Sequence, residues 1–254
     1  MRFDDPILQE YIETFYGYGN YGGRHWLVGM EEGGGDNFEE VASRVSAWTR
    51  RSKPELDDVL GFHRETRLHK WFRPNPPLQP TWNKLIRLLL RAQGLSADTD
   101  TVRAYQGATL GRANGPNCLL ELLPLPSPSA NEWLYSTHSA IPWLQNRTAY
   151  REHVAPTRMR HLQERIGQHR PGVVVFYGLG YRQWWEQIVG SPFVATELDG
   201  FYVARTDPTF FALTKHPANR GITNQYFERA GTLVSGLLAD INQDGRFPMG
   251  NWTG

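Results

Sequence analysis

Two short stretches of this chain combine polar side chains with turn-forming residues in a way that could support bond cleavage. The first, Gly-Met-Glu-Glu-Gly at 29–33, places Glu31 and Glu32 beside free backbone N–H groups. The second, Lys-His-Pro-Ala-Asn-Arg-Gly at 215–221, places His216 ahead of a basic loop tip. A carboxylate opposite a histidine suits a transition state that separates charge. The carboxylate faces the cationic half and orients water, and the imidazole donates to the departing anion.

Both stretches directly follow segments that we predict to be strands. Residues 25–30 form a short apolar run between turn signals, and residues 210–214 form another just before the histidine loop. Thr223 or Asn224 can cap the helix that follows. His216 is therefore expected where a strand ends and a loop begins, which is where open α/β sheets bind ligands.

The rest of the chain alternates in the same way between predicted strands and helices. Further strands are expected at 117–125, 172–177 and 201–204, and helices at 5–16, 37–50, 82–93, 148–169, 184–188 and 224–241. We predict a turn at 17–23, a mixed pattern at 54–80 and an irregular tail at 242–254. The alternation favours one α/β domain over 1–254, a three-layer α/β/α arrangement with a mostly parallel central sheet.

The amino-acid composition excludes several classes of protein. A 40% hydrophobic and 13% aromatic chain of 254 residues can build a large core, which argues against disorder. The net charge of +1 excludes a general positive coat, so any nucleic-acid contact must be a local patch. The single cysteine, Cys118, lies in an apolar run and is expected to be buried. It excludes internal disulfides and four-cysteine metal or iron–sulfur sites.

No stretch approaches the roughly 18 apolar residues of a membrane span, and the N-terminus lacks a signal pattern. We therefore expect a soluble, cytoplasmic protein without a membrane partner, and we expect it to be a monomer. Metal-ligand spacings such as His-x-x-x-His and Cys-x-x-Cys do not occur in the sequence, so no metal and no cofactor are predicted.

Taken together, the two polar stretches resemble the signature motifs of the uracil-DNA glycosylase superfamily, Gly-x-(Asp/Asn)-Pro-Gly and His-Pro-Ser. The order also fits: an early first motif, a leucine-rich strand, a valine-rich strand with Gly-x-Gly, and the His-Pro loop before the last helix. The resemblance spans roughly residues 26–236, with 37–80 as an insertion. It implies a DNA glycosylase that flips out a uracil or modified pyrimidine and hydrolyses its N-glycosidic bond, without cofactor.

The resemblance assigns a role to the residues of both motifs. Glu31 takes the position of the Asp or Asn that orients water and supports the oxocarbenium-like sugar. His216 takes the position of the histidine that hydrogen-bonds the leaving base. Gly29 and Met30, in the first motif, are expected to contact the substrate.

DNA contacts are implied for the loop after His216, which matches the family loop that enters the minor groove and wedges the duplex. Its expected DNA-binding residues are Pro217, Asn219, Arg220 and Gly221. The flipped base is expected to stack on an aromatic residue ahead of the leucine-rich helix. Trp71 and Phe72 are the nearest candidates, and both could instead be core residues.

Three departures from the family pattern bear on the chemistry. Glu31 and Glu32 replace the Asn/Asp-Pro pair, and Ala218 replaces the usual serine. Glu121 falls near the family's base-reading asparagine, and a carboxylate donates a hydrogen bond only when it is protonated. Ionised Glu121 would favour an exocyclic amine, which opens the site to a cytosine-like or otherwise modified base. A shift of one residue in strand register would instead turn Glu121 away from the site.

Other readings of the same residues stay open. His216 could simply cap its loop, and the two glutamates of the first motif could lie at a helix N-terminus. The fold could bind a nucleic acid or nucleobase without cleaving it. Gly178-Leu-Gly180 after the 172–177 strand could bind a dinucleotide cofactor, although Gln183 stands where the third glycine belongs.

Overall fold

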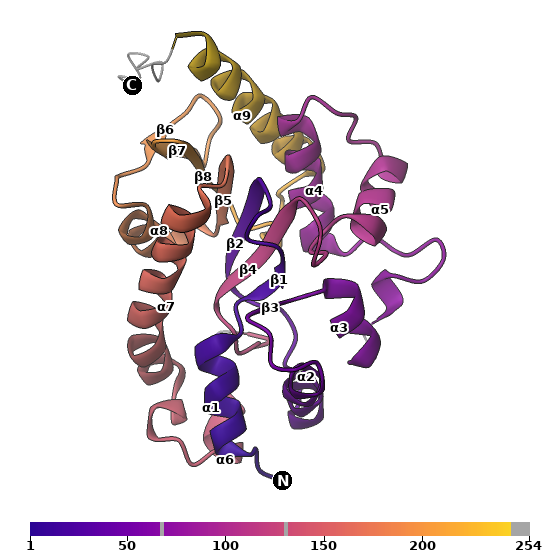
Figure 1. Cartoon of the computed structure of the whole chain (residues 1–254), viewed down its shortest axis with the longest axis vertical. Helices are drawn as coiled ribbons and strands as arrows, with labels where there is room; N and C mark the ends of the chain where they lie inside the picture. The colour runs from indigo at the N-terminus through magenta and orange to yellow at the C-terminus, as the bar shows by residue number, and fades with distance from the viewer. Residues whose placement is uncertain (67–68, 130–131, 245–254) are drawn as a thin grey trace.

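One sheet runs through the centre of the molecule. The computed structural model in Figure 1 describes residues 1–66, 69–129 and 132–244. Within these residues, eight strands pair in the order β3-β1-β4-β2-β5-β8-β7-β6. They are β1 (Gly17–Gly19), β2 (His25–Glu31), β3 (Leu56–Asp57), β4 (Asn117–Leu123), β5 (Val173–Tyr177), β6 (Val194–Ala195), β7 (Phe201–Thr206) and β8 (Thr209–Thr214).

The four central strands, β4, β2, β5 and β8, are mutually parallel. Their sequences are nearly continuous apolar runs, and β5 is buried along its whole length, as is typical of parallel strands covered on both faces. The outer pairs β1–β4, β7–β8 and β6–β7 are antiparallel. The predicted α/β class with a mostly parallel central sheet is confirmed.

Helices cover both faces of the sheet. In Figure 1, α7 and α8 lie on one side and α4, α5 and α9 on the other. The helices are α1 (Asp5–Thr14), α2 (Phe38–Arg50), α3 (Val59–Glu65), α4 (Pro80–Ala92), α5 (Thr99–Ala108), α6 (Tyr135–His138), α7 (Arg147–His169), α8 (Arg182–Val189) and α9 (Asn224–Asp244). Short 3₁₀ turns occur at η1 (His69–Trp71), η2 (Pro142–Leu144) and η3 (Leu179–Tyr181). In the described part of the chain, no helix is long and apolar enough to cross a membrane.

The order of the parallel strands creates a switch point. After β2 the chain moves outward to β4, and after β5 it moves in the opposite direction to β8. The two connections therefore diverge between the neighbouring strands β2 and β5. Open α/β sheets bind ligands beyond the carboxyl ends of the strands at such a point.

Three local predictions need correction. The segment predicted as a turn at 17–23 begins with β1, because Gly17 and Gly19 let the backbone of β4 approach so closely that a Cβ at either position would collide with it. Helix α5 was not predicted. Helix α9 extends to Asp244, so residues 242–244 are helical rather than irregular, and 245–254 lie outside the described residues.

The segment between β2 and α4 has more order than its mixed sequence predicts. Residues 37–80 contain α2, β3, α3 and η1, and β3 joins the edge of the sheet. Whether this segment is an insertion stays a prediction. It supplies part of the wall of the site described below.

Helix α9 follows the histidine loop and packs against α4. Thr223 caps it by accepting a hydrogen bond from the backbone N–H of Tyr226, as predicted. Gly231 allows close approach to α4, since a Cβ there would collide with the carbonyl oxygen of Leu88. The packing of α4 on α9 therefore fixes the position of the loop between β8 and α9.

Candidate functional site

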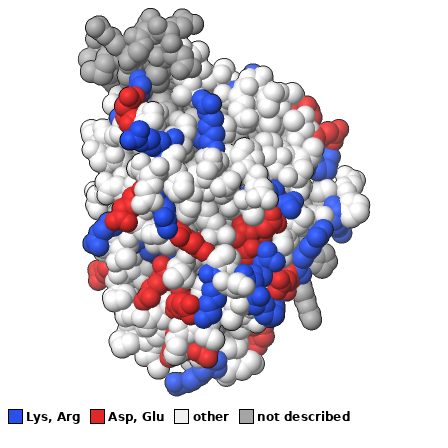
Figure 2. Space-filling model, viewed as in Figure 1, with Lys and Arg blue, Asp and Glu red and all other residues white. Residues whose placement is uncertain are grey.

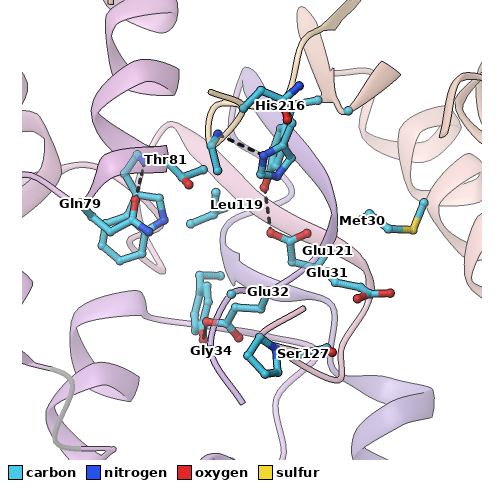
Figure 3. Close-up of a pocket in the computed structure, with 18 of the residues that line it drawn as sticks. Met30, Glu31, Glu32, Gly34, Gln79, Thr81, Leu119, Glu121, Ser127 and His216 are labelled. Carbon is cyan, nitrogen blue, oxygen red and sulfur yellow. Dashed lines mark hydrogen bonds between the residues drawn. The ribbon is translucent and has the colours of Figure 1, made fainter. Parts of the chain in front are cut away.

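A cavity of about 830 Å³ opens at the carboxyl edge of the sheet, at the switch point (Figure 3). Its volume is typical of ligand pockets. Residues at the ends of the parallel strands form its floor, and residues between α3 and the first turn of α4 form one wall. That wall comprises His63, Lys70, Trp71, Gln79, Thr81 and Trp82.

Three residues on neighbouring strands build the floor. Glu121 and Tyr177 line the cavity, whereas Gly29, predicted to contact the substrate, lies beneath their side chains and is not part of the lining. Gly29 of β2 lies in register with Glu121 of β4, and Tyr177 ends β5 on the other side of β2. The hydroxyl group of Tyr177 donates a 2.8 Å hydrogen bond to Oε1 of Glu121 (Figure 3). A Cβ at Gly29 would collide with both side chains. The two side chains therefore meet above the middle strand because its residue is glycine, and Glu121 faces the site rather than away from it.

Burial changes the chemistry of Glu121. Its Oε2 atom is enclosed and has no hydrogen-bond partner among the described residues. The pKa of this carboxyl group is raised to about 8, first by desolvation and then by the charges of Glu32 and Glu31, against the opposing effect of the Tyr177 hydrogen bond. Glu121 is therefore mostly protonated at neutral pH. Of the two forms of Glu121 that the sequence leaves open, the raised pKa favours the protonated one, which can donate a hydrogen bond.

His216 lies directly after β8 and lines the same cavity. Its Nδ1 atom accepts a 3.1 Å hydrogen bond from the backbone N–H of Ala218, so the proton of the neutral ring is on Nε2. Its ring centroid is 5.5 Å from that of Tyr177. Burial, and secondly the charge of Lys84, lowers the pKa of His216. The histidine caps its loop and also brings a neutral N–H donor to the cavity.

Glu31 ends β2 and is bound by two arginines of α7. Its Oε2 atom forms an ion pair with Arg147, and its Oε1 atom lies 3.0 Å from Nη2 of Arg151. Only 8% of the Glu31 side chain is exposed. Arg147 also donates to the carbonyl oxygen of Ser129, and Arg151 lies over the ring of Tyr181. The first turns of α7 therefore tie together the loops that follow β2, β4 and β5.

Glu32 has a separate set of partners. Its Oε2 atom lies 2.8 Å from Nη1 of the buried Arg44, and its Oε1 atom accepts a hydrogen bond from Tyr18. Arg44 also binds Glu40, four residues before it in α2. Since α2 begins at Phe38 and is capped by Asn37, the first-motif glutamates do not lie at a helix N-terminus. They belong to the end of β2 and the loop after it.

The other predicted substrate-binding residues are divided between the cavity and the core. Trp71 lines the cavity wall, with Nζ of Lys70 4.6 Å from its ring centroid. Phe72 is not part of the lining and packs against His63 and Trp82. Met30 lines the cavity but is only 4% exposed, and in Figure 3 it lies away from His216.

The predicted DNA-binding loop is mostly exposed. Pro217 is buried, and its carbonyl oxygen accepts a hydrogen bond from Lys84. Asn219 lines the cavity, whereas Arg220 and Gly221 are exposed at the loop tip. Gly221 has a φ of 81°, a conformation that favours glycine. Figure 2 shows acidic and basic side chains interspersed over the viewed face, in keeping with the near-zero net charge.

Several residues of the site were not predicted from the sequence. Tyr177 was recognisable only as the last residue of the strongest strand. Arg147 and Arg151 show the i, i+4 spacing of one helix face, but their partner Glu31 is more than 100 residues away. Among the described residues, no group of three or more His, Cys, Asp or Glu side chains could hold a metal ion. Cys118 is buried, as expected.

No family model matches this chain, and none of the curated proteins shows significant similarity to it. Fold and site together define an α/β protein with a polar cavity at the switch point of its sheet. That cavity brings together a histidine with a lowered pKa, a glutamate with a raised pKa and a glutamate bound by two arginines.

Proposed function

We propose that this protein is a DNA glycosylase with a uracil-DNA glycosylase-like fold, which hydrolyses the N-glycosidic bond of a flipped-out pyrimidine base. One observation carries the proposal. Glu31, Glu121 and His216, which the sequence resemblance links to water positioning, base reading and leaving-group stabilisation, line one cavity although they come from three different strand ends. The cavity lies where open α/β sheets bind ligands.

The geometry suits an anionic leaving group. When the bond between the sugar C1′ and the base nitrogen breaks, its electron pair stays with the base and negative charge reaches the base carbonyl oxygen. The Nε2–H of neutral His216 can donate to that oxygen without transferring its proton. A positioned donor of this kind contributes about 3–4 kcal/mol to transition-state stabilisation.

Glu31 can position the attacking water in spite of its ion pairs. Each carboxylate oxygen has about two acceptor positions. Arg151 donates to Oε1 through both Nε and Nη2, whereas Oε2 accepts one hydrogen bond, from Arg147. The remaining position on Oε2 can accept a hydrogen bond from a water molecule that attacks C1′; the proton that this water loses balances the proton that the departing base anion takes up. The arginines make Glu31 rigid, which favours a fixed water geometry.

The loop tip supports contact with DNA. Asn219 lies at the mouth of the cavity and Arg220 is exposed beside it. This arrangement allows a local basic contact with the backbone beside a flipped nucleotide, and it requires no basic coat over the rest of the surface.

The test is base release from single- and double-stranded oligonucleotides that contain uracil, 5-hydroxymethyluracil, hypoxanthine or C5-modified cytosines. Abasic sites are detected as alkali-labile breaks. We expect release of at least one pyrimidine by the wild type and its loss in both His216→Ala and Glu31→Gln. Specific binding of these oligonucleotides without release of any base would instead indicate a nucleic-acid-binding protein on the same fold.

A further inference from the structure

The Glu121–Tyr177 pair holds a hydrogen-bond donor that the fold itself does not use. The neutral pair has two hydroxyl hydrogens, one on the carboxyl group and one on the phenol. Only one of them is needed for the 2.8 Å hydrogen bond between the two side chains. The second oxygen of Glu121, Oε2, has no partner among the described residues. One O–H group is therefore left over, whichever of the two side chains donates in the internal bond.

The position of the pair allows this spare donor to bind a ligand in the cavity. Both side chains line the cavity, and Tyr177 lies beside His216. A buried donor without a partner is unfavourable, and a ligand that supplies an acceptor removes this cost. Glycine at position 29 keeps the space that lets the two side chains meet.

We propose that the Glu121–Tyr177 pair recognises its ligand by donating one hydrogen bond to an acceptor atom on the edge of a base, such as a ring carbonyl oxygen. Ionisation of Glu121 abolishes this recognition, because the phenol hydrogen then satisfies the carboxylate and no donor remains. The inference rests on the proposed function for its class of ligand. It reverses the sequence-based preference for an exocyclic amine, since the neutral pair can meet the carbonyl oxygen O4 of uracil.

The charged groups around the pair favour the neutral form. Two carboxylates, Glu31 and Glu32, lie at the end of the neighbouring strand, and Arg158 contacts the backbone carbonyl of Glu121 rather than its carboxyl group. The hydroxyl of Tyr177 does not compete in this pH range, because burial raises its pKa well above 10. The titratable or charged groups that face the pair are Glu31 and Glu32 after β2, Arg158 of α7, and His216 after β8.

The experiment measures binding without cleavage. The probe is an oligonucleotide with one 2′-fluorinated deoxyuridine, whose glycosidic bond resists hydrolysis, and the reference is the same strand with an abasic analogue. The base preference is the ratio of the two Kd values, measured from pH 6.5 to 9. For the wild type we expect this preference to fall above pH 8, approaching tenfold per pH unit.

Two variants distinguish the effect of the hydrogen-bond donor from the effect of the side chain's shape. Glu121→Gln keeps an N–H donor that does not titrate, so its base preference should persist and stay constant with pH. It also controls for any titration of the DNA. Glu121→Leu removes the donor and should lose the preference at every pH. Thermal unfolding of each variant shows that it is folded.

The outcomes separate this inference from the proposed function. A wild-type preference that is constant with pH, or a Glu121→Gln variant that behaves like Glu121→Leu, would overturn the inference. Base release from a cleavable uracil strand is measured in the same preparations. Absence of release together with the expected pH dependence of binding would refute the glycosylase and leave the recognition by Glu121 intact.

Discussion

Lys84 holds the loop that carries His216: its Nζ atom lies 2.5 Å from the carbonyl oxygen of Pro217. Lys84 belongs to α4, the helix whose first turn contributes Thr81 and Trp82 to the cavity wall. The same side chain therefore links the wall to the histidine loop. It also places a positive charge near the imidazole, which helps to keep the ring neutral.

Replacing Lys84 by Met should raise the pKa of His216. Its charge is the second cause, after burial, of the lowered pKa, so removing it moves the titration toward the ordinary value. An NMR titration of the His216 ring would show the shift. If neutral His216 is the active form, the acid limb of kcat/KM should move to higher pH as well. Lys70→Met, in the same wall of the cavity, is the matched control and should leave the titration of His216 in place.

Replacing Gly29 by Ala should separate Glu121 from Tyr177, because the new methyl group occupies the space where their polar atoms meet. We expect a loss of about 1–3 kcal/mol in the free energy of unfolding, the usual cost of overpacking. Urea denaturation would measure it. The control is Gly33→Ala, four residues further on, where a Cβ meets no atom within 4 Å. Equal stability of the two variants would contradict the close packing at Gly29.

Glu121 should make the wild type progressively less stable than its Gln variant as pH rises. Its carboxyl pKa is about 8 in the folded protein against an ordinary 4.5, so the folded state binds the extra proton between these values. Folding is therefore disfavoured as pH rises through this window, by roughly 5 kcal/mol at most. Urea unfolding of wild type and Glu121→Gln at pH 5, 7 and 9 would show the difference growing with pH. A difference that is independent of pH would mean that Glu121 titrates normally.

Replacing Arg220 by Ala should weaken DNA binding at all sequences alike. A single phosphate contact lowers the slope of log K against log salt by about 1, without changing the preference among bases. Kd values measured between 50 and 200 mM salt would test this expectation. Arg160→Ala on the exposed face of α7 is the control. An unchanged salt slope in the Arg220 variant would remove the loop tip from the DNA interface.

Two glycines of α9 should respond in opposite directions to alanine. Gly231→Ala would push a methyl group into the carbonyl oxygen of Leu88 on α4, and we expect a loss of about 1–3 kcal/mol. Gly236→Ala meets no atom within 4 Å and should stabilise the helix by roughly 0.5–1 kcal/mol. Thermal or urea unfolding of the pair measures how much the α4–α9 contact contributes.

The sequence predicts the strand ends better than the chemistry that takes place at them. Strands β2 and β8 are recognisable because each is an apolar run beside turn residues, and the position of His216 follows directly from the end of β8. The state of Glu121 could not be predicted in this way. It depends on Tyr177 and Gly29, which reach it only through the register of three strands. A single residue of slippage would have placed the same glutamate in a different environment.

The contacts of Glu31 were hidden for a related reason. The i, i+4 spacing of Arg147 and Arg151 identifies one face of a helix, but nothing local indicates what that face meets. The partner becomes visible only when the crossover from β4 to β5 brings the start of α7 over the end of β2.

The cavity is built from two sources that can change separately. Its floor comes from the carboxyl ends of the strands. One wall comes from the segment that runs from α3 to the first turn of α4, here called the excursion. Substitutions or changes of length in that excursion would alter which molecules fit, while the positions of Glu121 and His216 stay fixed by the sheet. Grafting a related excursion onto this scaffold would therefore be a route to new selectivity with the same reactive groups.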